Sequence, residues 1–157
     1  MNLKNFSASA ILGAFAAIGA WAQVPGVLSI ADPVKLTVPR AGEAVQTLKL
    51  QLKPGYHLNS NTPNEEFLIP IRLTWNSAAV EAVSVQYPKP TTEKTEFSEK
   101  PLSVFTGDFE IVTKFRRAAK ASPGPGFLNG KLRYQACNDK MCLPPKTLDV
   151  KVPLLVE

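Results

Sequence analysis

Proline and glycine recur so often along this chain that no long helix fits between them. The sequence holds 14 prolines and 9 glycines among 157 residues, and a proline in a helix interior costs about 3 kcal/mol. The one helix-friendly piece, residues 116–120, is too short to be stable alone. The chain is therefore expected to fold from strands.

The stretches between these breaks alternate apolar and polar residues, which is the pattern of half-buried strands. We predict that a strand over 45–52 points Val45, Leu48, Leu50 and Leu52 inward. About seven or eight short strands with turn signals between them favour an all-β, immunoglobulin-like antiparallel β-sandwich, with a small barrel as the alternative. The other expected strands cover residues 34–38, 69–75, 80–87, 104–115 in two halves around Gly107, 128–136 and 148–152; residues 122–126 are predicted to be a loop, and those before Val34 a loose arm.

The N-terminus has the features of an export signal. Lys4 precedes an apolar run over 8–18, and the small-x-small pattern Ala20-Trp21-Ala22 follows. The run is shorter than the roughly 20 residues of a membrane-spanning helix, although an apolar helix retained in the mature protein is the alternative. We predict a cleaved signal peptide over 1–22, a single domain over 23–157 and a periplasmic location.

Charge gives little reason to expect a nucleic-acid ligand. The formal net charge is +5, and loss of Lys4 with the signal would lower it to +4. The densest basic patch is Lys114, Arg116, Arg117 and Lys120, and no block of five or six like charges occurs. This patch is interpreted as a solvated strand end, so no nucleic-acid partner is expected.

Only two cysteines occur, Cys137 and Cys142, and in an oxidising compartment such a pair is expected to be bonded. The bond would close a loop of six residues, for which loop entropy predicts only about 2 kcal/mol of stabilisation. A redox-active disulfide, a structural turn disulfide and a metal site all remain open, although two thiolates and one distant histidine fall short of a four-ligand site. Because Pro144 and Pro145 tend to stay out of a sheet ladder, Cys142 should be the more exposed sulfur.

Three segments resemble a known family. Tyr134-Gln-Ala-Cys137, followed by Cys142-Leu-Pro-Pro145, is similar to the active-site segment of the N-terminal domain of the thiol:disulfide interchange protein DsbD. The segment Gly55-Tyr-His-Leu-Asn59 resembles the Gly-aromatic segment beside that family's cysteines, and Glu96-Phe97 resembles its cap loop. The resemblance extends from about Val34 to Val152.

The resemblance implies an immunoglobulin-like domain that takes electrons from a membrane-embedded partner and passes them to periplasmic thioredoxin-like proteins. Cys142 matches the cysteine that forms mixed disulfides, Cys137 its resolving companion, and Phe97 the cap over the disulfide. No metal, nucleotide or flavin cofactor is implied. Since no membrane-spanning or thioredoxin-like region follows, the electron donor is expected to be a separate protein.

Two features differ from the best-known members: the cysteines are one residue closer, and His57 and Asn59 replace tyrosines near the sulfurs. His57 is the only histidine. One hypothesis puts its imidazole near Cys142, to assist proton movement or favour a thiolate. The alternative for His57 is a histidine at the edge of a turn that makes an ordinary hydrogen bond. The alternative for Phe97 is a place in the core.

Two other functions fit the same sequence. One is a periplasmic binding module in which the disulfide only pins a turn, and the other is a chaperone-like domain that uses an exposed sheet edge. The enzyme class therefore stays open at this point, between a thiol:disulfide interchange component and a binding domain.

Overall fold

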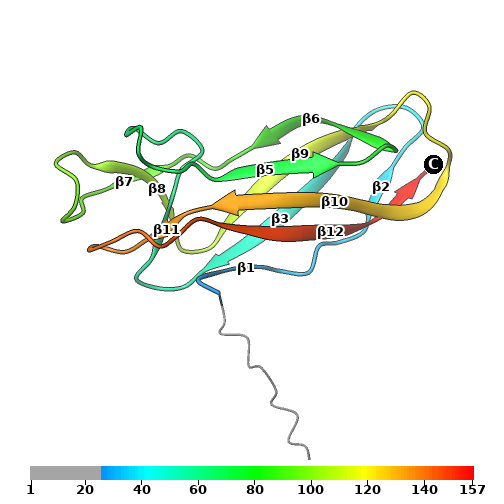
Figure 1. Ribbon diagram of the computed structural model, residues 1–157. Helices are drawn as coiled ribbons and strands as arrows, with labels where there is room; N and C mark the ends of the chain where they lie inside the picture. The colour runs from blue at the N-terminus through cyan, green and yellow to red at the C-terminus, as the bar shows by residue number, and fades with distance from the viewer. Residues whose placement is uncertain (1–25) are drawn as a thin grey trace, which may run out of the picture.

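The computed structural model describes residues 26–157, which form strands and the connections between them (Figure 1). The predicted signal peptide over 1–22 lies outside the described residues. Within 26–157, no helix is long and apolar enough to cross a membrane.

Two four-stranded sheets make the body of the molecule. All neighbouring strands run antiparallel except β2 and β12, which are parallel. The first sheet has the order β1 (Leu28–Ile30), β3 (Ala44–Leu52), β9 (Phe109–Arg117), β6 (Val80–Gln86), and the second has the order β2 (Leu36–Val38), β12 (Lys146–Val156), β10 (Gly124–Tyr134), β5 (Arg72–Asn76).

These sheets pack face to face around one apolar core that draws buried residues from both. Trp75 on β5 links them, because its ring meets the Phe115 ring of β9 edge-on at 5.3 Å between centroids. The Trp75 Nε1 group also donates a hydrogen bond to Thr113 Oγ1 at 3.1 Å. The predicted immunoglobulin-like antiparallel β-sandwich is confirmed.

A third, smaller sheet lies at the end of the sandwich opposite the C-terminus (Figure 1). Its strands have two to five residues and are antiparallel throughout. Its order is β11 (Ala136–Cys137), β4 (His57–Asn59), β8 (Leu102–Thr106), β7 (Thr91–Glu93).

One inward-facing assignment was wrong. Val45 is 56% exposed, whereas Gln46 beside it is buried. Leu48, Leu50 and Leu52 share one face of β3, and the period of two puts Gln46, not Val45, on that face. In the strand expected over 80–87, Val83 is exposed, at a β-bulge between Ala82 and Ser84 that shifts the register of β6 against β9.

Several predicted boundaries also need correction. Residues 28–30, expected in a loose arm, instead form β1 and pair with β3. The predicted loop over 122–126 is partly strand, because Gly124 begins β10 and pairs with Val156. The strand expected over 69–75 begins only at Arg72. Arg116 and Arg117 end β9, and Arg116 pairs with Glu81 at 2.8 Å, in keeping with the predicted solvated strand end.

Gly130 is expected to be essential to the packing of Trp75 against β10. A Cβ at Gly130 would lie 2.7 Å from Trp75 Cε3, so Gly130→Ala should destabilise the fold by about 1–3 kcal/mol through overpacking. Urea unfolding measures this. Gly126→Ala on the same strand is the control, because a Cβ there meets nothing within 4 Å. Equal stability of the two variants would contradict the packing argument.

Candidate functional site

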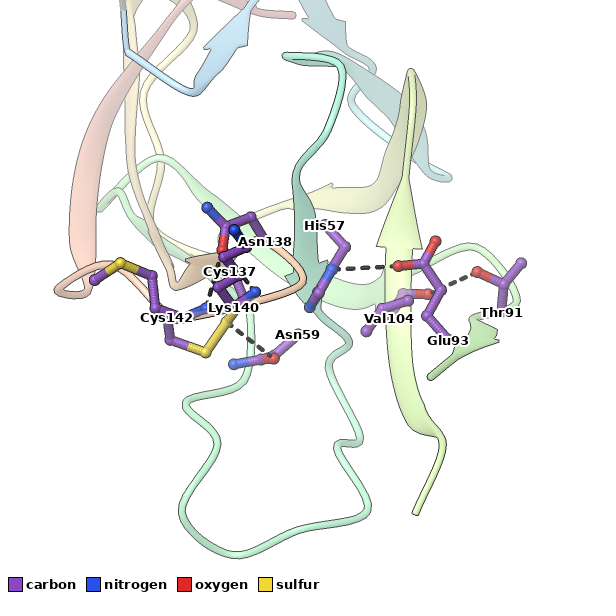
Figure 2. A network of polar contacts seen from close by, with 10 residues as sticks. His57, Asn59, Thr91, Glu93, Val104, Cys137, Asn138, Lys140 and Cys142 are labelled. Atoms are coloured by element: carbon purple, nitrogen blue, oxygen red, sulfur yellow. Dashed lines mark hydrogen bonds and ion pairs between the residues drawn. A yellow bond between two sulfur atoms is a disulfide. The ribbon is translucent and has the colours of Figure 1, made fainter. Parts of the chain in front are cut away.

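The small sheet presents two chemically different faces. Leu58, Phe105 and Ala136 belong to the main core. Side chains alternate along a strand, so His57, Asn59 and Cys137 project from the opposite face (Figure 2). That outer face therefore combines a sulfur atom, an amide and an imidazole, all of them buried.

Cys137 and Cys142 are joined by a disulfide with an S–S distance of 2.05 Å. They face each other in an antiparallel bridge, flanked by the hydrogen bonds Asn138 N–H to Met141 O and Leu143 N–H to Ala136 O. This is the narrow, non-hydrogen-bonded type of pair, in which Cα atoms are about 4.5 Å apart. The predicted bond is present, and its Cα separation of 3.9 Å lies just below the expected 4.4–6.8 Å.

The turn between the cysteines is closed by its own first residue. Asn138 Oδ1 accepts hydrogen bonds from the backbone N–H groups of Lys140, at 3.0 Å, and Met141, at 2.9 Å. Asparagine commonly closes turns in this way. The segment 136–143, called here the cysteine hairpin, is therefore held by backbone and amide bonds in addition to its disulfide.

The two sulfurs differ in access. Cys137 has no exposed surface, whereas Cys142 is partly exposed, which is the difference predicted from the prolines that follow it. Cys142 and Phe97 both pack against a small apolar cluster of Leu68, Leu102 and Val104. Access to the disulfide therefore runs past Cys142.

Phe97 lies in the connection from β7 to β8, residues 94–101, called here the cap loop. Its ring is half-buried against the cluster that also contacts Cys142, and Glu96 is exposed. The backbone N–H of Glu96 donates a hydrogen bond to Asp139 O in the cysteine hairpin at 3.1 Å. The predicted cap residues are thus tied to the hairpin by one backbone hydrogen bond and one apolar contact region.

Asn59 is held in a fixed orientation beside the disulfide. Its Nδ2 group donates to Ile69 O at 3.1 Å and to Gln135 Oε1 at 3.0 Å, and its Oδ1 atom lies 3.9 Å from Cys137 Sγ. Gln135 also donates from Nε2 to Leu143 O, beyond Cys142. Sequence reasoning missed Gln135, although its place two residues before Cys137 puts it on the same face.

His57 begins β4, soon after the turn at 54–55, and is only 2% exposed. The register places it opposite Cys137, the disulfide partner of Cys142. His57 Nδ1 lies 3.2 Å from Glu93 Oε2 (Figure 2). Burial lowers the pKa of His57 below its ordinary value, and the nearby carboxylates of Glu93 and Asp139 only partly offset this.

Tyr134 is placed differently from the other proposed site residues. It is buried in the main core with Ala136, whereas Gln135 and Cys137 contact Asn59 on the other side. Burial raises the pKa of Tyr134. The structure therefore places Tyr134 behind the site and brings Cys137, Cys142, Phe97, His57 and Asn59 together at it.

Comparison with protein families gives this site a context. The family described as "Thiol:disulfide interchange protein DsbD, N-terminal" matches residues 27–154, which include the cap loop and the cysteine hairpin. The chain belongs to this family. The DsbD N-terminal membership and the Cys137–Cys142 disulfide together support thiol–disulfide exchange as the activity of the site.

Two solved structures are similar to this DsbD-type domain. The N-terminal periplasmic domain of ScsB from Proteus mirabilis matches with a TM-score of 0.52 and 16% identity, over 74% of this chain and 43% of that one. The N-terminal domain of Neisseria meningitidis DsbD in the reduced form matches with a TM-score of 0.48 and 17% identity, over 80% and 81% of the two chains. This chain thus spans less than half of the ScsB domain. Among curated proteins, none matches by sequence comparison.

The disulfide should contribute little to the stability of this DsbD-type domain. Replacing both Cys137 and Cys142 by alanine should cost no more than about 2 kcal/mol, because the bond closes a short loop and the hairpin keeps its backbone bonds. Circular dichroism and urea unfolding check this. An unfolded double variant at ambient temperature would favour the structural-disulfide alternative.

Proposed function

We propose that this domain is a periplasmic electron carrier, which takes two electrons from a separate membrane-embedded reductase and delivers them to thioredoxin-like proteins. The observation that carries the proposal is the asymmetric disulfide, with Cys137 fully buried and Cys142 partly exposed against the apolar cluster that Phe97 of the cap loop also contacts. The proposal includes export by cleavage of residues 1–22 and a mature domain over 23–157.

The exchange proceeds through the exposed sulfur. In the reduced domain, the Cys142 thiolate attacks a partner disulfide, which forms a mixed disulfide and releases one partner thiolate. Cys137 then attacks Cys142 Sγ, so the domain becomes oxidised and the partner leaves as a dithiol. The membrane reductase returns two electrons and two protons in the reverse sequence.

Two measurements test the proposal. Equilibration with a glutathione buffer should give a reduction potential above about −300 mV, the level below which structural disulfides of secreted proteins typically lie. The reduced domain should also reduce the disulfide of a periplasmic thioredoxin-like protein in stoichiometric amounts. A potential below that level, together with no transfer, would leave a binding module with a structural turn disulfide as the better interpretation.

A further inference from the structure

Cys137 has a proton that must leave before the second exchange step can occur. The attacking species is the thiolate, yet Cys137 is 0% exposed and its surroundings disfavour a buried charge. Its proton therefore has no direct route to water. Some neighbouring group has to accept it.

Asn59 has a polar atom within hydrogen-bond distance of the Cys137 sulfur, but it cannot accept the proton. Its Oδ1 atom lies 3.9 Å from Cys137 Sγ, so it is in position to accept a hydrogen bond from the reduced thiol. An amide oxygen, however, does not take up a proton near neutral pH. Asn59 orients the thiol and leaves the transfer to another residue.

His57 stands directly opposite Cys137 in the antiparallel ladder. Residues so paired carry their side chains on the same face, with Cβ atoms about 4.5–5.5 Å apart. His57 Nε2 is buried and has no hydrogen-bond partner. In Figure 2 the imidazole lies between Cys137 and Asn59 on one side and Glu93 on the other.

Glu93 sets the tautomer of this imidazole and offers its proton a path to solvent. Because Glu93 Oε2 is 3.2 Å from His57 Nδ1, its negative charge favours the proton on Nδ1 and leaves the Nε2 lone pair free. The Glu93 side chain is 39% exposed. Glu93, His57 and Asp139 also line one pocket of about 250 Å³.

We infer that His57 is the proton acceptor for the resolving thiol Cys137, with Glu93 as the residue that positions and electrostatically supports it. This inference rests on the proposed exchange function. His57 Nε2 takes the Cys137 proton, and the new thiolate attacks Cys142 Sγ in the mixed disulfide. The Cys137–Cys142 bond forms, the bond from Cys142 to the partner breaks, and the partner sulfur leaves with the electron pair and takes a proton from solvent. The imidazolium returns its proton to solvent beside Glu93.

The charged groups around His57 agree with this role. Glu93 on β7 and Asp139 in the cysteine hairpin raise the pKa of His57, and burial lowers it by more. Lys53 and Tyr56 border the same pocket from the turn before β4. The net lowering keeps the imidazole neutral, and so able to accept a proton, at neutral pH.

The test separates the two exchange steps with the small disulfide DTNB. Reduced domain should release one thionitrobenzoate when Cys142 attacks, at a rate proportional to reagent concentration. It should release a second when Cys137 resolves the adduct, at a rate independent of that concentration. His57→Gln keeps the size and removes the titratable nitrogen, so it should slow only the second phase, by roughly 10²-fold.

The pH profile supplies a readout that a purely structural role would not change. In the wild-type domain, the second phase should fall as pH drops through the lowered pKa of His57. In His57→Gln it should instead rise steadily with pH. Glu93→Gln should move the wild-type midpoint to lower pH, because Glu93 raises that pKa. Glu110→Gln, an exposed carboxylate on β9, is the control and should match the wild type.

The outcomes are distinct. A second phase in His57→Gln with the wild-type rate and pH profile would overturn the relay, and so would an equal slowing of both phases. If the wild-type domain itself releases only one thionitrobenzoate and fails to reduce a thioredoxin-like protein, the exchange function fails, and the relay fails with it.

Discussion

A Cys137→Ala variant should accumulate a covalent adduct with a thioredoxin-like protein, whereas Cys142→Ala should form almost none. The partly exposed Cys142 remains able to attack in the first variant, and no thiol is left to resolve the product. In the second variant the remaining thiol, Cys137, has no exposed surface. This is the largest effect expected for any substitution, because most of one variant and almost none of the other should be found in the adduct.

The partner for this experiment is a thioredoxin-like protein with a single cysteine, activated as its thionitrobenzoate disulfide. Attack by Cys142 then expels thionitrobenzoate, and no second partner cysteine can reverse the reaction. Non-reducing gels and intact mass quantify the adduct. Adducts with Cys142→Ala alone would reverse the two assigned roles, and adducts with neither variant would argue against exchange through this disulfide.

Removal of the cap ring should expose the disulfide to small thiols. Phe97→Ala is expected to speed reduction by glutathione about tenfold. Full burial of such a side chain is worth roughly 1.5–3 kcal/mol, and Phe97 is half-buried. Its removal should therefore destabilise the closed cap loop relative to the open one by about 1.4 kcal/mol, which raises the open population about tenfold.

Phe127→Ala provides the matched control, since Phe127 is 57% exposed on β10 and lies outside the small sheet. The disulfide of the Phe127→Ala variant should be reduced at the wild-type rate. Both variants should unfold at nearly the wild-type urea concentration. Unchanged reduction together with a large loss of stability in Phe97→Ala would place the ring in a structural role instead.

Much of the sandwich could be predicted because its long strands show a regular alternation of apolar and polar residues. Leu48, Leu50 and Leu52 repeat with the period of a strand, and β3 forms where that period occurs. In the small sheet, β8 overlaps the first half of the strand expected over 104–115, but β4 could not be found in this way. All three residues of β4 are buried, since one face meets the core and the other the cysteine hairpin, so no apolar–polar alternation exists to detect.

The candidate site was predictable in its sulfur chemistry and less so in its surroundings. The lone cysteine pair in an exported chain predicted the bond, and the prolines after Cys142 predicted that it is the more exposed sulfur. The pairing of His57 with Cys137, and the approach of Glu93 to His57, depend on the order β11-β4-β8-β7. That order joins segments some 80 residues apart in the chain, and no local pattern encodes it.

The hydrogen bonds on both sides of the Cys137–Cys142 pair have a consequence for the proposed role as an electron carrier. Asn138 N–H to Met141 O and Leu143 N–H to Ala136 O do not involve sulfur, so the hairpin should keep its shape when the disulfide is reduced. The reduced and the oxidised domain would then offer partners nearly the same surface. Oxidised molecules would compete with reduced ones for every acceptor. Turnover in the cell should therefore depend on the ratio of the two forms rather than on the total amount of the protein alone.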